Sequence, residues 1–176
     1  MKPRGPLMIE HRLIEKVLKV AERRAPSFSA TAYDPIFIET IVDFVRTYAD
    51  RTHHGKEEDI LFTELAKVRL DPADAAMMAD LVDEHRQARA RVKSIVELNE
   101  AFKRGDTSVV PRIAELVLWL AAFYPVHIRK EDREFFPNTE RYFTPAQLDE
   151  MLERFWEFDR AMIHEKYQRV YEAIRA

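Results

Sequence analysis

Apolar side chains recur along the chain at alternating spacings of three and four residues, the pattern of amphipathic helices. One such stripe contains Leu7, Ile14, Leu18 and Ala21. Runs of alternating polar and apolar residues, which would indicate strands, are almost absent. The pattern predicts five helical segments, over residues 7–24, 34–68, 71–103, 108–136 and 144 to the C-terminus.

Three of the predicted helix starts share one local signal, a short polar residue followed by proline. Asp34-Pro35 and Asp71-Pro72 each place a side chain that can cap free backbone amides before a proline suited to the first turn. Thr144-Pro145 does the same, and Gln147 stands where it can complete a capping box.

Short connections make each predicted helix a neighbour of the next. We therefore expect an all-α fold, an up-down-up-down four-helix bundle with an additional C-terminal helix. Residues 1–140 are expected to form the bundle, and residues 141–176 a C-terminal helix that packs on the same domain.

Composition narrows the classes of function. The 176-residue chain has no cysteine, which excludes disulfides, thiolate catalysis and iron–sulfur ligation by its own residues. Its formal net charge of -3 gives no overall attraction to nucleic acid. No apolar run approaches the roughly 20 residues of a membrane span, and the N-terminus has no secretory pattern. A cytoplasmic protein without nucleic-acid or membrane partners is expected.

Histidines occupy positions in the apolar stripes where a bundle would normally place leucine. His11, His85 and His127 lie in the first, third and fourth stripes, and His53 lies in the second together with Glu57. Burying imidazole and carboxylate together is costly unless each finds a strong partner. A metal ion would satisfy all of them.

The chain also repeats itself. The segments 53–62 and 127–136 each have His, then Lys three places on, Glu at four, an acid at five and Phe at nine. Glu10-His11-Arg12 is echoed by Glu84-His85-Arg86. Because residues four apart share a helix face, each His-x-x-x-Glu pair can converge on one site. The predicted ligands of two metal ions are His11, His53, Glu57, His85, His127 and Glu131.

Some choices within this set have close competitors. His54 competes with His53, and the residues that precede His53 on its helix face are the more apolar. Asp132 competes with Glu131, which the repeat pairs with Glu57. Tyr124, one turn before His127, either approaches the site or is an ordinary packing aromatic.

His164 falls at the edge of the fifth stripe. A structural or supporting role is expected for this residue rather than ligation.

These motifs resemble those of the hemerythrin-like family, also called the HHE cation-binding domain, over about residues 7–137. The resemblance implies an up-down four-helix bundle with an oxygen-bridged di-iron centre. Oxygen-carrying hemerythrins have His-x-x-x-His on the third helix, whereas His85 is followed by Arg89. The set of four histidines and two carboxylates looks more like proteins that repair iron–sulfur centres, whose cysteine-containing N-terminal segment this chain does not have.

The expected cofactor is therefore a pair of iron ions, oxo- or hydroxo-bridged, with manganese or zinc as substitutes. Ferritin-like di-iron helices use Glu-x-x-His, a spacing not found here. We expect a protein that binds or senses oxygen, nitric oxide or redox state, with an unidentified protein redox partner. The alternatives are a di-iron oxidoreductase that reduces peroxide or nitric oxide, and iron donation or iron–sulfur centre repair.

Overall fold

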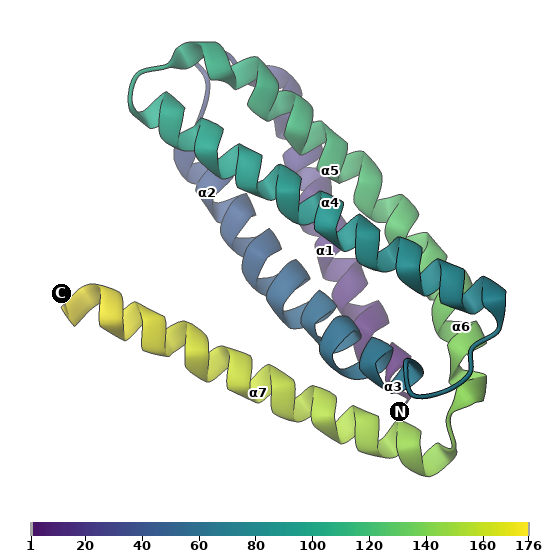
Figure 1. Ribbon diagram of the computed structural model, residues 1–176. Helices are drawn as coiled ribbons and strands as arrows, with labels where there is room; N and C mark the ends of the chain where they lie inside the picture. The colour runs from purple at the N-terminus through teal and green to yellow at the C-terminus, as the bar shows by residue number, and fades with distance from the viewer. Residues whose placement is uncertain (1, 176) are drawn as a thin grey trace.

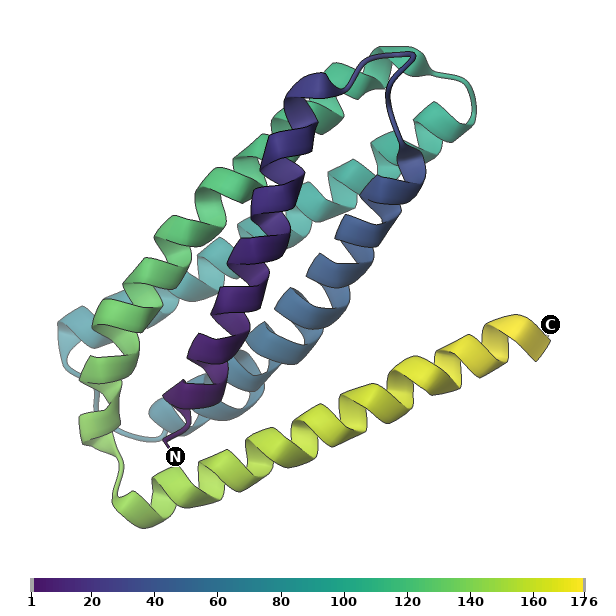
Figure 2. The ribbon, with the colours of Figure 1, turned by 180° about the vertical axis from the view of Figure 1, so that it is seen from behind.

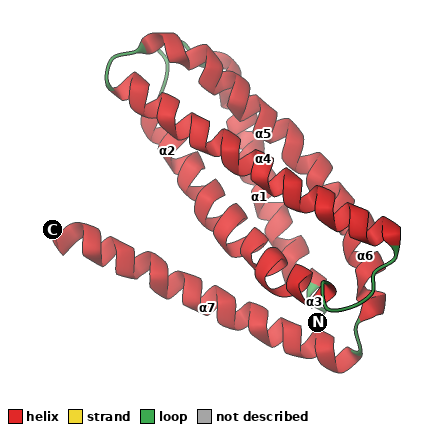
Figure 3. Cartoon of the chain, viewed as in Figure 1, coloured by secondary structure: helices red, strands yellow, loops and turns green. Residues whose placement is uncertain are grey.

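The computed structural model describes the backbone of residues 2–175 and the side chains of residues 2–162. Within the described backbone every regular element is helical and no strand occurs (Figure 3). The prediction of an all-α chain is confirmed. The side chain of His164 lies outside the described residues.

Four long helical rods and one further helix follow the chain order. Rod 1 is α1, Arg4–Arg24. Rod 2 is a continuous run of α-helical and π-helical turns, made of α2 (Pro35–Phe44), η2 (Val45–His54), η3 (Glu57–Phe62) and α3 (Thr63–Leu65).

Rod 3 is α4, Pro72–Lys103, and the last helix is α7, Pro145–Arg175. Rod 4 between them is α5 (Val110–Lys130), the π-helical η5 (Glu131–Phe135) and α6 (Phe136–Thr139), with 3-10 turns η4 (Thr107–Val109) and η6 (Glu140–Tyr142) at its ends. A further 3-10 turn, η1 (Ala25–Ser27), follows α1.

Two of the predicted helix starts have the expected capping bonds. The Asp34 side chain accepts from the backbone N–H groups of Ile36 and Phe37. Thr144 and Gln147 form the reciprocal capping box. At the third start Asp71 is extended but caps nothing with its side chain, which instead binds Arg141. Local signals therefore set where rod 2 and α7 begin.

The four rods lie side by side with alternating direction (Figures 1 and 2). Rod 1 contacts α5 and rod 2, and α4 contacts α5 and rod 2. Each rod thus buries two flanks against its neighbours, and a single interior runs along the centre.

Two apolar clusters fill that interior. One includes Ile14 and Leu120, and the other includes Leu7 and Phe135. In the sequence of each rod the predicted metal ligands lie at the boundary between these two clusters. His11, for example, lies between Leu7 and Ile14. The core is therefore apolar above and below a polar layer.

The first part of helix α7 packs against the rods. Met151 and Phe155 are buried in the same cluster as Leu7. A Cβ atom built on Gly55 would lie 2.7 Å from Cζ of Phe158, so glycine permits this close approach. Further along, α7 diverges, and its C-terminal end stands away from the rods in both views (Figures 1 and 2).

The helical stretch Thr107–Tyr142 is 36 residues long with a mean hydropathy of 1.5 in its most apolar window, enough by length and composition to cross a membrane. Arg112 and Glu115 interrupt this stretch, so it is not an uninterrupted apolar run of roughly 20 residues, and the absence of a membrane partner stays a prediction. Core helices of soluble proteins pass the same test. Because the helix packs against α1 and α4 and carries buried His127 and Glu131, the finding is weak evidence for a membrane span.

Candidate metal centre

All six predicted ligands lie in the buried polar layer, and each rod contributes at least one imidazole. The layer contains His11 of α1, His53 and Glu57 of rod 2, His85 of α4, and His127 and Glu131 of rod 4, all buried. The prediction that these side chains lie at one level agrees with this geometry.

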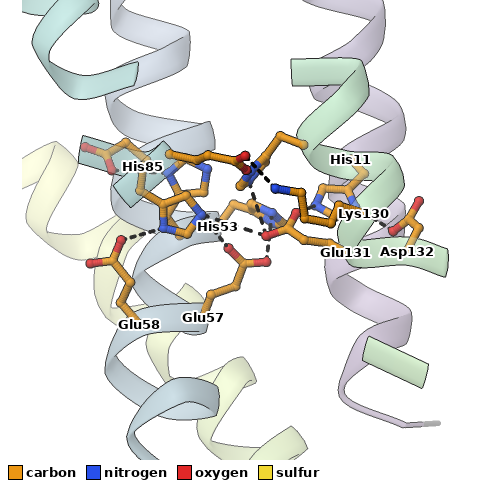
Figure 4. A network of polar contacts seen from close by, with 12 residues as sticks. His11, His53, Glu57, Glu58, His85, Lys130, Glu131 and Asp132 are labelled. Atoms are coloured by element: carbon orange, nitrogen blue, oxygen red, sulfur yellow. Dashed lines mark hydrogen bonds and ion pairs between the residues drawn. The ribbon is translucent and has the colours of Figure 1, made fainter. Parts of the chain in front are cut away.

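The two glutamates lie between imidazoles from different rods (Figure 4). Oε2 of Glu131 is 3.2 Å from Nε2 of His11, and Oε1 is 3.2 Å from Nε2 of His127. Oε1 of Glu57 is 3.4 Å from Nε2 of His53, and Oε2 is 3.5 Å from Nε2 of His85. Each carboxylate therefore presents one oxygen to each side of the layer.

Behind each imidazole lies a second carboxylate, and it faces the opposite ring nitrogen. Nδ1 of His11 donates to Asp132 at 2.7 Å, and Nδ1 of His85 donates to Glu58 at 2.6 Å. The other two pairs are His53 with Glu10 at 2.9 Å and His127 with Glu84 at 2.8 Å. Because an ionised carboxylate can only accept, these bonds place the one proton of a neutral imidazole on Nδ1 and leave its lone pair on Nε2.

A cation in turn holds each of these outer carboxylates. Lys56 binds Glu10, and Lys130 binds Glu84 at 2.5 Å. Arg12 binds Asp132, and Arg89 binds Glu58 at 2.8 Å. The sequence repeat now has a physical reason. The lysine three places after each histidine and the acid five places after it belong to these outer layers.

The ring nitrogens and carboxylate oxygens that face the middle of the layer have no hydrogen-bond partner. This is the property expected of atoms that bind a metal. Among the described side chains, the buried nitrogen and oxygen atoms without a partner are Nε2 of His11, His53, His54, His85 and His127, both carboxylate oxygens of Glu57 and Glu131, and Oε1 of Glu140. Native proteins leave few buried polar atoms unpartnered. Two ligand atoms that each lie about 2.1 Å from one metal ion and subtend a right angle at it are about 3.0 Å apart. The separations between the facing nitrogen and oxygen atoms found here are close to that distance.

The electrostatics of the layer are strongly perturbed. Burial and the neighbouring Glu131 charge raise the pKa of Glu57 well above its ordinary value. Burial alone would raise the pKa of Glu131, but the surrounding imidazoles outweigh it and hold that pKa well below its ordinary value. The charges of two neighbouring buried carboxylates repel each other, so it is unfavourable for both to be ionised unless positive charge lies between them.

The pKa values of the imidazoles are also shifted in opposite directions. Burial lowers the pKa of His53 to about 4. Burial also acts to lower the pKa of His11 and His127, but the adjacent acids outweigh it and raise these values to about 9 and about 10.

The potential ligand atoms form two groups, each lying within 4.8 Å of one another: His11, His53, Glu57 and Glu131 in one, and His54, His85 and His127 in the other. His54 is thus part of the layer, although the sequence treats it as a competitor of His53. Asp132 lies behind His11 rather than between the imidazoles. Tyr124 is buried, and its ring stacks with His54 at 6.2 Å.

Residues 6–139 match the family described as the Hemerythrin HHE cation binding domain. The chain belongs to this family. No curated protein sequence matches the chain. The HHE match spans the four rods and ends before α7, which begins at Pro145. This HHE domain is a cation-binding domain, and its buried histidine and glutamate groups fit a metal site.

The two lysines of the repeat offer a matched test of the outer layer. Lys56 is fully buried and also bonds Asp159 of α7 at 2.7 Å, whereas the Lys130 side chain is 26% exposed. Lys56→Met leaves Glu10 buried without its cation and should lower the free energy of unfolding by about 3–5 kcal/mol. Lys130→Met should cost clearly less, because water can reach Glu84. Urea unfolding of both metal-free variants measures the difference, and equal costs would contradict the argument.

Metal loading should release protons at neutral pH. Metal binding needs neutral imidazoles and ionised carboxylates. His11 and His127, with pKa values of about 9 and about 10, and Glu57, whose pKa is raised, carry protons in metal-free protein. Affinity should therefore rise as the pH increases toward those values and fall on acidification.

Calorimetric titration with Mn²⁺ in buffers of different ionisation enthalpy counts the protons released. Asp132→Asn removes a contact that raises the His11 pKa, so it should reduce that count. Binding without any proton release would contradict these assignments.

Proposed function

We propose that the chain holds two iron ions between the imidazoles of His11, His53, His85 and His127 and the shared carboxylates of Glu57 and Glu131. We propose further that this pair binds or senses a small diatomic ligand, oxygen or nitric oxide, or responds to redox state. The four rods would then be the up-down-up-down four-helix bundle expected for the family, with α7 as an added C-terminal helix.

One observation carries the proposal. Nine buried donor atoms from four rods face one another without hydrogen-bond partners. The outer carboxylates orient the imidazoles of the four proposed ligands with Nε2 inward, and the cations behind them hold the carboxylates. Such preorganisation is costly in an empty core and favourable around cations.

The donor set favours iron. Mixed imidazole and carboxylate ligands suit iron or manganese, and structural zinc sites generally use four ligands. An iron pair can change its oxidation state and accept a small ligand at an open position. The surrounding residues then have three roles: they hold the metals, orient the imidazoles and keep bulk water out.

The burial of the layer favours a small ligand. His11, Glu57, His85 and Glu131 have no exposed surface. A cavity of about 490 Å³ reaches the layer beside His54, and Tyr124 also lines it. Diatomic molecules fit such a route, and extended substrates would require the rods to separate.

Glu57→Ala and Glu131→Ala should each abolish the binding of two irons per chain. Either change removes a donor to both metal positions. Iron analysis after anaerobic reconstitution measures the stoichiometry, and circular dichroism checks that the variants remain helical. Asp59→Ala and Glu134→Ala are matched controls, because these acids are exposed on the same two segments. Two irons retained without Glu57 or Glu131 would contradict the ligand assignment.

Optical spectra of anaerobically purified, iron-loaded protein test the proposed ligand chemistry. Exposure to oxygen or nitric oxide should produce new charge-transfer absorption that scales with iron content. Unchanged spectra with both gases would contradict binding of diatomic ligands. Continuous consumption of nitric oxide or peroxide with an added electron donor would show that the protein is an oxidoreductase and not a sensor.

A further inference from the structure

The cavity beside the buried layer lies between rod 2 and α4, and one residue of α5, Tyr124, also lines it. Its volume of about 490 Å³ is within the range of pockets that hold organic ligands and far exceeds the needs of a diatomic molecule. Val45, Ala88 and Val92 give it buried apolar walls. The cavity is therefore large enough and apolar enough for an organic molecule.

The phenol of Tyr124 is a polar group without a partner in this cavity. The side chain is only 1% exposed, and its hydroxyl makes no hydrogen bond to any residue whose side chain the structure describes. Native proteins leave few buried polar groups unpaired. A molecule that extends to this buried end of the cavity would supply the partner with an oxygen atom of its own.

The mouth of the cavity carries an uncompensated positive charge. Of the charged residues that line it, Arg89 bonds Asp50 at 2.7 Å, and Lys93 lies 3.8 Å from Glu97. Arg46 is exposed and has no ion-pair partner among the described side chains. The charge balance at the mouth therefore favours an anion.

A second cavity marks where that anion would stop. It has a volume of about 420 Å³, continues along rod 2 and α4, and shares Arg46 with the first. Its other charged residues are the acids Glu39, Asp43 and Glu100 and one cation, Arg51. Because the acids outnumber the cation, a negative group is favoured at Arg46 and disfavoured beyond it.

The separation of the two polar ends sets the length of the occupant. Arg46 lies eight residues before His54, and the His54 ring stacks on Tyr124 with centroids 6.2 Å apart. A rise of about 1.5 Å per residue gives at most about 12 Å along rod 2. A saturated chain of about ten carbon atoms spans that distance.

We propose that this cavity is a binding site for a small amphipathic carboxylate. Its charged end meets Arg46, its apolar body lies against Val45 and Val92, and an oxygen at its far end bonds the phenol of Tyr124. The site uses none of the six proposed metal ligands. An occupant would also close the route proposed for diatomic ligands, a consequence that rests on the proposed function.

Calorimetric titration of the full-length chain with probes of ten carbons tests the charge preference. Decanoate should bind with one molecule per chain. Decan-1-amine, which has a similar apolar body and the opposite charge, should bind at least about tenfold more weakly. The titration is done on iron-free and on iron-loaded protein, so that the result does not depend on iron binding.

Two conservative variants test the two ends of the cavity separately. Arg46→Gln should weaken decanoate binding by about fivefold, because it removes the cation that meets the carboxylate. Arg69→Gln is the matched control, since Arg69 is exposed and does not line the cavity. Tyr124→Phe should weaken 10-hydroxydecanoate by about fivefold and leave decanoate within about twofold, because only the hydroxylated probe bonds the phenol.

Four results would overturn the proposal: no binding of decanoate to either form of the protein, equal binding of decanoate and decan-1-amine, Arg46→Gln binding decanoate as tightly as Arg69→Gln does, or Tyr124→Phe changing both acids alike. Protein that binds decanoate as expected but no iron would instead defeat the proposed function and leave this site standing.

Discussion

The structure depends on one costly feature, a layer of imidazole and carboxylate groups buried in the middle of an apolar interior. Glu57 and Glu131 have no exposed surface, and their oxygens face imidazole nitrogens at 3.2–3.5 Å without hydrogen bonds. Such groups are stable in a protein core when a strong partner compensates the lost hydration. A metal cation is such a partner, and the remaining polar network holds the ligand atoms that would face it.

The same sequence pattern supplies that network from two parts of the chain, and the two copies differ in detail. The two His-x-x-x-Glu segments, their lysines and the preceding Glu-His pairs give the layer an approximate internal symmetry. Two additions break it. Asp159 of α7 reaches Lys56 but has no counterpart among the described partners of Lys130, and His54 adds an imidazole on one side only. The asymmetry of the site therefore comes from α7, which lies outside the repeat, and from position 54, where the second copy of the repeat has Ile128.

Much of the fold and of the inner site could be predicted from sequence because both follow from helical periodicity. Histidines replacing apolar residues in four stripes could be placed at one level from residue counts alone. The inward position of His54 could not be predicted, because a regular α-helix would turn it away from His53, and the π-helical turns that bring both inward have no simple signal in the sequence. The outer carboxylates were visible as parts of the repeat, but their pairing across rods depends on how the rods are rotated against each other.

Anomalous diffraction at the iron edge from crystals of the iron-loaded protein tests the central claim most directly. The account predicts two adjacent peaks within the buried layer, one beside His11 and His53 and one beside His85 and His127, with Glu57 and Glu131 between them. A single peak, or peaks at surface acids with the layer free of iron, would contradict it.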